Sequence, residues 1–68
     1  MNGREFIRRA RRYASRTGKS VRFVPGHGKG SHGRLWVGER FTWVPRSELG
    51  PGLLRAMLNQ LQIAKEEF

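Results

Sequence analysis

The stretch VRFVPGHGKGSHGRLWVGERFTWVP, residues 21–45, decides the fold that the sequence predicts. It contains three short runs of the β-branched and aromatic residues that strands prefer, at 21–24, 34–37 and 40–44. Pro25 and Pro45 end the first and third runs, and Gly38-Glu39 is typical of a tight hairpin turn. We therefore expect a three-stranded antiparallel sheet.

A helix is expected before this sheet, over residues 2–17. Asn2 is its N-cap, with Glu5 three positions later, and Gly18 closes it. On a helical wheel, apolar side chains lie on one arc and arginines on the opposite arc. The apolar arc consists of Phe6, Ile7, Ala10, Tyr13 and Ala14, and the basic arc of Arg4, Arg8, Arg9, Arg11, Arg12 and Arg16. One face of the helix should pack, and the other should be basic and exposed.

A second helix is expected after the sheet, because Pro51 suits the first turn of a helix and an apolar arc follows. That arc consists of Leu53, Leu54, Met57, Leu58 and Leu61. Residues 65–68 are expected to fray. The predicted fold class is α+β, in the order α-β-β-β-α, with two helices on one face of the sheet and the other face open.

The composition indicates a small basic protein that binds phosphate groups. A chain of 68 residues is expected to form a single domain, residues 1–68. Fourteen Lys and Arg against five Asp and Glu give a formal charge of +9, which attracts polyanions. No stretch resembles a membrane span or a signal peptide, so we expect a cytoplasmic protein without a membrane partner. With no cysteine, disulfides, thiol chemistry and cysteine-based zinc sites are excluded.

The glycine-rich loop between the first two strands carries the candidate chemistry. Lys29, Gly30, Ser31 and His32 bring together a cation, backbone amides, a hydroxyl and an imidazole, a combination suited to binding phosphate. An imidazole with a pKa of about 6.5 can take the ribose 2′-hydroxyl proton or protonate the departing 5′-oxygen. His32 is therefore the candidate catalytic residue of a metal-independent RNA cleavage. Its spacing alone also fits an ordinary surface histidine.

Other candidate residues are less specific. His27 lies between two glycines and is expected to be solvated or to touch RNA, and two histidines alone make a poor metal site, so no metal or cofactor is expected. The arginines of the first helix could contact RNA or simply cover a solvated face. Four aromatic residues could stack on bases, but alternation should bury some of them, and the sequence does not separate Trp36 from Trp43. The four are Tyr13, Trp36, Phe41 and Trp43.

Three segments in this order resemble the HicA-type mRNA interferase toxins over nearly the whole chain. They are Lys29-Gly30-Ser31-His32 entering a strand, Phe41-Thr42-Trp43-Val44-Pro45 in the third strand, and the segment GPGLLRAML, residues 50–58. The resemblance implies a double-stranded-RNA-binding-like fold, a catalytic role for His32, and a HicB-type antitoxin that blocks the active face. Gly33 departs from the bulky or polar residue that often follows this histidine, and Gln62 stands where relatives often have glycine.

These observations lead to a principal hypothesis and two alternatives. The principal hypothesis is an endoribonuclease, the toxin of a toxin–antitoxin pair, that cleaves mRNA with His32. Lys29, Gly30, Ser31 and Arg34 would hold phosphate, and Arg8, Arg12 and His27 would contact RNA or the antitoxin. The first alternative is a non-catalytic RNA-binding module of the same fold. The second is a basic protein that acts only through a protein partner.

Overall fold

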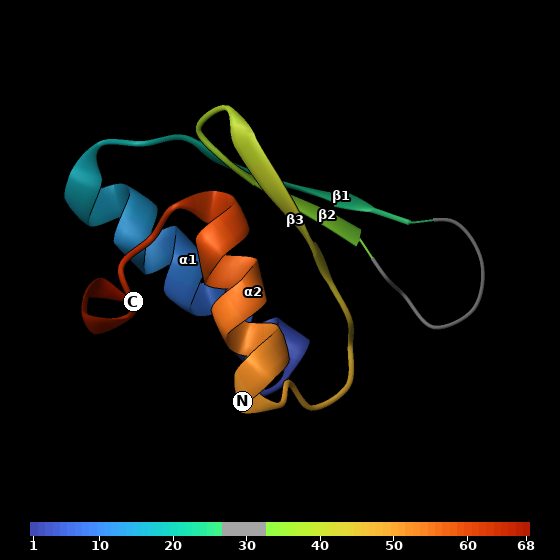
Figure 1. The fold of residues 1–68 in the computed structure, drawn as a ribbon. Coiled ribbons are helices and arrows are strands. Elements are labelled where there is room, and N and C mark those ends of the chain that lie inside the picture. The colour runs from blue at the N-terminus through green and yellow to red at the C-terminus, as the bar shows by residue number, and fades with distance from the viewer. Residues whose placement is uncertain (27–32) are drawn as a thin grey trace.

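The computed structural model describes residues 1–26 and 33–68. The elements follow the order α1, β1, β2, β3, α2, with a short 3-10 turn near the end of the chain (Figure 1). Their bounds are α1 Gly3–Thr17, β1 Val21–Pro25, β2 Gly33–Val37, β3 Arg40–Val44, α2 Pro51–Leu61 and the 3-10 turn Lys65–Glu67. The predicted α+β fold, with two helices packed on an antiparallel three-stranded sheet, is confirmed.

Helix α1 begins and ends where its capping residues predict. The Asn2 side chain accepts a hydrogen bond from the Glu5 backbone N–H at 2.9 Å, which satisfies one of the free donors of the first turn. Gly18 takes the left-handed conformation, with φ 71°, and its N–H donates to the Ala14 carbonyl. The two caps thus fix where α1 begins and ends, and the apolar arc between them faces the sheet.

The strands pair in the order β1-β2-β3, and both pairings are antiparallel. Gly38 joins β2 to β3 with φ 64°, a conformation that glycine adopts without steric cost. At the other end of the sheet, Pro25 pairs with Gly33 and Gly33 pairs with Val44. We call this row of three residues the attachment end, because the segment 27–32 joins the sheet there.

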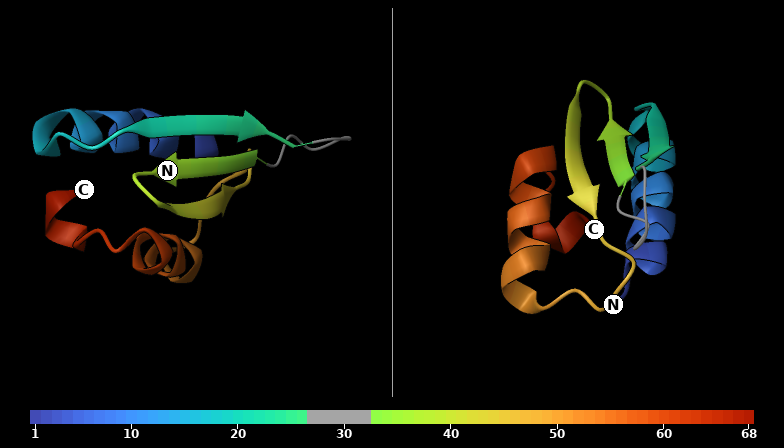
Figure 2. Two further views of the ribbon diagram at one scale, coloured as in Figure 1. Left: turned by 90° about the horizontal axis from the view of Figure 1, so that it is seen from above. Right: turned by 90° about the vertical axis from the view of Figure 1, so that its right-hand side faces the viewer.

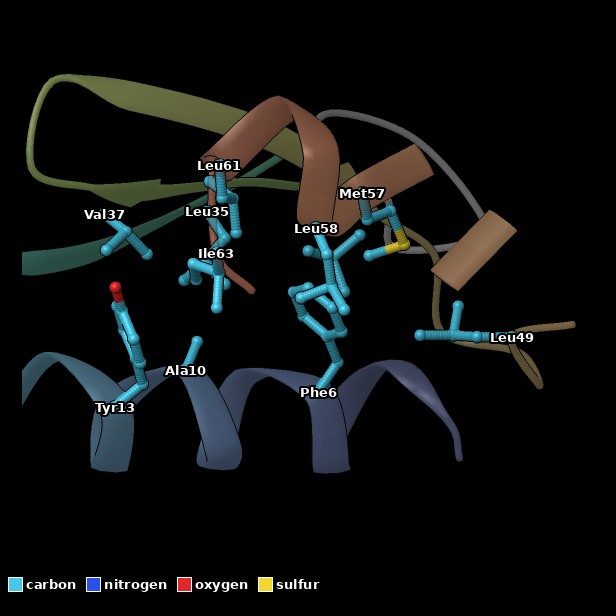
Figure 3. Packing of buried hydrophobic residues seen from close by; sticks show 11 residues of the cluster. Phe6, Ala10, Tyr13, Leu35, Val37, Leu49, Met57, Leu58, Leu61 and Ile63 are labelled. Atoms are coloured by element: carbon cyan, nitrogen blue, oxygen red, sulfur yellow. The ribbon is translucent and has the colours of Figure 1, made fainter. Parts of the chain in front are cut away.

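Both helices pack on the same face of the sheet (Figure 2). Phe6 of α1 and Leu35 of β2 are completely buried, and Met57 of α2 is 2% exposed. Figure 3 shows the side chains of α1 directed toward those of β2 and α2 in one cluster. The cluster consists of Phe6, Ala10, Tyr13, Leu35, Val37, Val44, Leu49, Met57, Leu58, Leu61 and Ile63. Among the described residues, no helix is long and apolar enough to cross a bilayer.

Helix α2 departs from its predicted apolar arc at one position. Met57, Leu58 and Leu61 are buried, but Leu53 is 45% exposed, so its assignment to the packed face was wrong. Leu53 lies in the first turn, and α2 contacts mainly β3, so the sheet does not cover its beginning. Gln62 ends the helix in the left-handed conformation, with φ 56°, which glycine adopts at lower cost.

The expectation that residues 65–68 fray was also wrong. The Phe68 ring packs against Phe6, with ring centroids 4.8 Å apart. Arg9 donates a hydrogen bond from Nε to the Phe68 carbonyl at 3.1 Å and lies over the Phe68 ring. Arg16 donates to the carbonyl of Glu67. Two arginines of the predicted basic arc therefore hold this segment against α1.

A matched pair of glycines tests the packing at the start of α1. A Cβ at Gly3 would lie 1.8 Å from the Pro45 carbonyl oxygen, whereas a Cβ at Gly52, in the first turn of α2, meets nothing within 4 Å. We expect Gly3→Ala to lower the free energy of unfolding by about 1–3 kcal/mol through overpacking. Gly52→Ala should leave it unchanged or raise it by about 0.5–1 kcal/mol. Urea denaturation measures both, and equal effects would contradict the close approach of α1 to Pro45.

Candidate nucleic-acid interface

Most of the predicted phosphate-binding segment lies outside the described residues. The residues concerned are His27, Lys29, Gly30, Ser31 and His32. The residues that flank the segment are described, and they give the place where it joins the fold. Gly33, which follows His32 in the chain, is buried and pairs with Pro25. The segment that carries the candidate catalytic histidine therefore starts and ends at the attachment end.

Packing explains why a glycine, and no larger residue, follows His32 in the chain. A Cβ at Gly33 would lie 2.3 Å from Cζ of the Phe23 ring and 2.9 Å from the Val24 carbonyl oxygen. Both contacts are closer than real Cβ atoms allow, so the Phe23 ring occupies the space that a side chain at Gly33 would need. Phe23 of the neighbouring strand thus fills the space into which a side chain at position 33 would project.

A hollow of about 470 Å³ lies beside the attachment end, on the side of the sheet that carries the helices. Ile7, Phe23 and Pro45 contribute apolar surface to it, and Arg4 and Arg46 contribute guanidinium groups. Arg4 comes from the first turn of α1 and Arg46 from the chain that leaves β3, and both are exposed. The hollow combines an apolar wall with two cations beside the attachment end.

Arg34 lies on the opposite side of the sheet from this hollow. It is exposed, one residue after Gly33, and alternation along β2 directs it away from the core. Its Cζ lies 5.4 Å from the Phe41 ring centroid and 5.2 Å from that of Trp43. Arginines from three separate parts of the chain, Arg4, Arg34 and Arg46, therefore flank the attachment end on both sides of the sheet.

The structure resolves which aromatic residues are buried. Tyr13 belongs to the core, with 5% of its surface exposed. Trp36 is half-buried, and Phe41 and Trp43 are 39% and 48% exposed on the sheet face away from the helices. We call this the open face, formed by Arg22, Val24, Arg34, Trp36, Phe41 and Trp43.

The sequence alone did not show which residues of β3 face the core. Thr42, between Phe41 and Trp43, is 1% exposed and faces the core, although it is the polar member of the triplet. Its hydroxyl donates a hydrogen bond to Oε1 of Gln60, which satisfies the buried group. The sequence feature that indicates the orientation of Thr42 is Val44, an aliphatic residue two positions later, because residues two apart on a strand share a face. Val44 is buried, as Thr42 is.

The basic face of α1 is smaller than the sequence indicates. Arg9 and Arg16 bind residues 65–68, whereas Arg8 and Arg12 stay exposed. Among the described residues, the one ion pair between two side chains joins Arg8 to Glu5, with nitrogen and oxygen 3.9 Å apart. At that distance, on exposed side chains, the pair contributes little. Most arginine charge in the described part of the chain is therefore not neutralised internally.

Comparison with protein-family models, with curated proteins and with solved structures gave no match for this chain. The resemblance to HicA-type toxins remains a prediction from the sequence. Within residues 1–26 and 33–68, no three His, Cys, Asp or Glu residues form a group that could hold a metal ion.

The contact between Gly33 and Phe23 can be tested by a double-mutant cycle. Gly33→Ala should lower the free energy of unfolding by about 1–3 kcal/mol, because the added methyl group meets the ring. In a Phe23→Leu background, the same change should cost less, with a coupling free energy of at least about 0.5 kcal/mol. Urea denaturation of the four proteins gives the coupling. Strict additivity would show that the ring does not occupy this space.

Proposed function

We propose that this protein is an mRNA-cleaving toxin of the HicA type, with His32 as its catalytic residue. The observation that carries the proposal is the set of exposed arginines around the attachment end. Arg4 and Arg46 line the hollow on the helix side, and Arg34 lies on the open face. The segment from His27 to His32 joins the sheet between them.

Arginines in this arrangement favour the binding of a polyanion that extends across the attachment end. A guanidinium can bind a phosphate through two parallel hydrogen bonds, and arginine is common wherever phosphate recognition matters. Like charges close together destabilise a fold unless a partner neutralises them. A polyribonucleotide supplies a phosphate at every step of its backbone, so it can engage arginines on both sides of the sheet end at once.

The proposed reaction needs one imidazole and one bound phosphate. His32 takes the proton from a ribose 2′-hydroxyl, and the 2′-oxygen bonds to the adjacent phosphorus. The bond from phosphorus to the 5′-oxygen breaks, that oxygen takes a proton from water as it leaves, and the His32 imidazolium returns its own proton to water. The products are a 2′,3′-cyclic phosphate and a 5′-hydroxyl end. Lys29, Ser31 and the Gly30 amide hold the phosphate as negative charge develops on its oxygens.

The proposal includes a partner and a location. An antitoxin of the HicB type would block the active face, and the exposed Arg8 and Arg12 of α1 would contact RNA or this antitoxin. Because mRNA is the substrate, the protein acts in the cytoplasm. No small-molecule cofactor takes part in the proposed reaction.

A cleavage assay on a long unstructured RNA, in excess chelator, tests the proposed function. The parent protein should cleave, and His32→Ala should cleave at least about 100-fold more slowly, the usual contribution of a general acid or base. His27→Ala is the matched comparison, because it removes the other imidazole of the same segment, which is expected to contact RNA or the antitoxin and not to transfer the proton. Any loss should therefore appear as weaker RNA binding, and the cleavage rate at saturating RNA should be retained.

The assay separates the alternatives once circular dichroism shows that all three proteins fold. Cleavage by His32→Ala at the parental rate would remove His32 from the mechanism. Intact RNA with every protein would favour the non-catalytic RNA-binding module.

A further inference from the structure

The open face is an ordered array of rings and guanidinium groups. Its residues pair across the three strands in two rows, Arg22 with Trp36 and Phe41, and Val24 with Arg34 and Trp43. The second row is one residue from the attachment end, and the first is two residues farther along the strands. No acidic residue occurs in either row.

Each ring in this array has a cation or another ring at contact distance. The Trp36 and Phe41 ring centroids are 4.8 Å apart, with the ring planes tilted by 37°. The Arg22 Cζ lies 5.6 Å from the Trp36 centroid, and Arg34 contacts both remaining rings. Each ring therefore has a neighbouring cation, and much of Phe41 and Trp43 is still open to solvent.

Stabilisation of the sheet explains only part of this pattern. Cross-strand aromatic pairs and cation–π contacts contribute to an antiparallel sheet, but the solvated face of such a sheet is usually polar. Here three of the six positions are aromatic and two are arginine. Trp43 is 48% exposed, so its ring gains little from burial within the protein itself.

We propose that the open face binds unpaired RNA by stacking two or three bases on Trp36, Phe41 and Trp43, while Arg22 and Arg34 hold the flanking phosphates. Every base has a π-face, so such stacking depends little on sequence. Bases in a duplex are already stacked on one another, and a double helix presents mainly phosphates and 2′-hydroxyls to a protein. The face therefore favours single strands over duplexes.

This inference rests on the proposed function for the identity of the ligand, because the bound strand is the RNA that is cleaved. The two tryptophans also lie at different distances from the attachment end. Trp43 lies in the row next to the attachment end, and Trp36 lies about 7 Å farther away at two residues' rise along a strand. A base stacked on Trp43 is thus closer to the attachment end than a base on Trp36.

The chain provides its own probe for this test. Both of its tryptophans, Trp36 and Trp43, belong to the open face, so a ligand that stacks there changes the tryptophan fluorescence directly. A short oligouridine, the DNA oligomer of the same length, and an RNA hairpin stem are the ligands. The experiment uses the full chain with His32→Ala to prevent cleavage of the RNA.

We expect the unpaired RNA and DNA to quench the fluorescence and the duplex stem to leave it nearly unchanged. Trp43→Ala and Trp36→Ala should each weaken binding of the unpaired oligomers about five- to a hundredfold, the range for loss of one base stack. Trp43→Phe, which retains a ring, should lose much less. Leu53→Ala is the matched control, because it removes an exposed apolar side chain of α2 and should leave binding unchanged.

Two outcomes would overturn the proposal. The first is binding of unpaired oligomers to Trp43→Ala and Trp36→Ala, shown to be folded by circular dichroism, with parental affinity. The second is ring-dependent binding of anionic lipid vesicles by a protein whose fluorescence no oligomer changes. Ring-dependent binding of unpaired DNA and RNA by a parent protein that never cleaves RNA would support this inference while removing the proposed function.

Discussion

The alternation of side chains along β2 determines both the core and the exposed surface of the sheet. Leu35 and Val37 point into the core, so Arg34 and Trp36 must point to the opposite side. Both helices pack on the core side, where Phe6 and Leu35 belong to one cluster of buried side chains. A shift of one residue in this strand would bury an arginine and a tryptophan and expose two aliphatic side chains. The register that builds the core therefore also builds the open face.

The same register places candidate chemistry at one end of the sheet. The pairing of Pro25 with Gly33 returns the chain to the sheet immediately after His32. The Phe23 ring occupies the space that a side chain at Gly33 would need. Exposed arginines flank this end on both sides of the sheet. Fold and candidate site thus depend on the same few contacts, and a substitution at Gly33 should disturb both.

The sequence predicted the elements well because their signals are local. Asn2 and Gly18 cap α1, and the helical and strand periods differ enough to separate the two kinds of element. The errors concern contacts between distant segments, such as Phe68 against Phe6, which no local pattern indicates. The open face falls between these cases. Its aromatic residues were candidates for stacking, but the sequence did not show which residues of β3 face the core. A threonine between two aromatic residues is expected to be exposed, whereas Thr42 is buried and donates a hydrogen bond to Gln60.

In the proposed complex, one RNA strand lies across the open face and is cut where residues 27–32 join the sheet. A DNA oligomer with a single ribonucleotide tests this arrangement, because only that position has the 2′-hydroxyl that cleavage needs. Abasic residues are then introduced at increasing distances on either side of the ribonucleotide. We predict slower cleavage when the abasic residues fall within the two or three nucleotides next to it on one side, and little effect farther away. The same cleavage rate wherever the abasic residues are placed would contradict this arrangement.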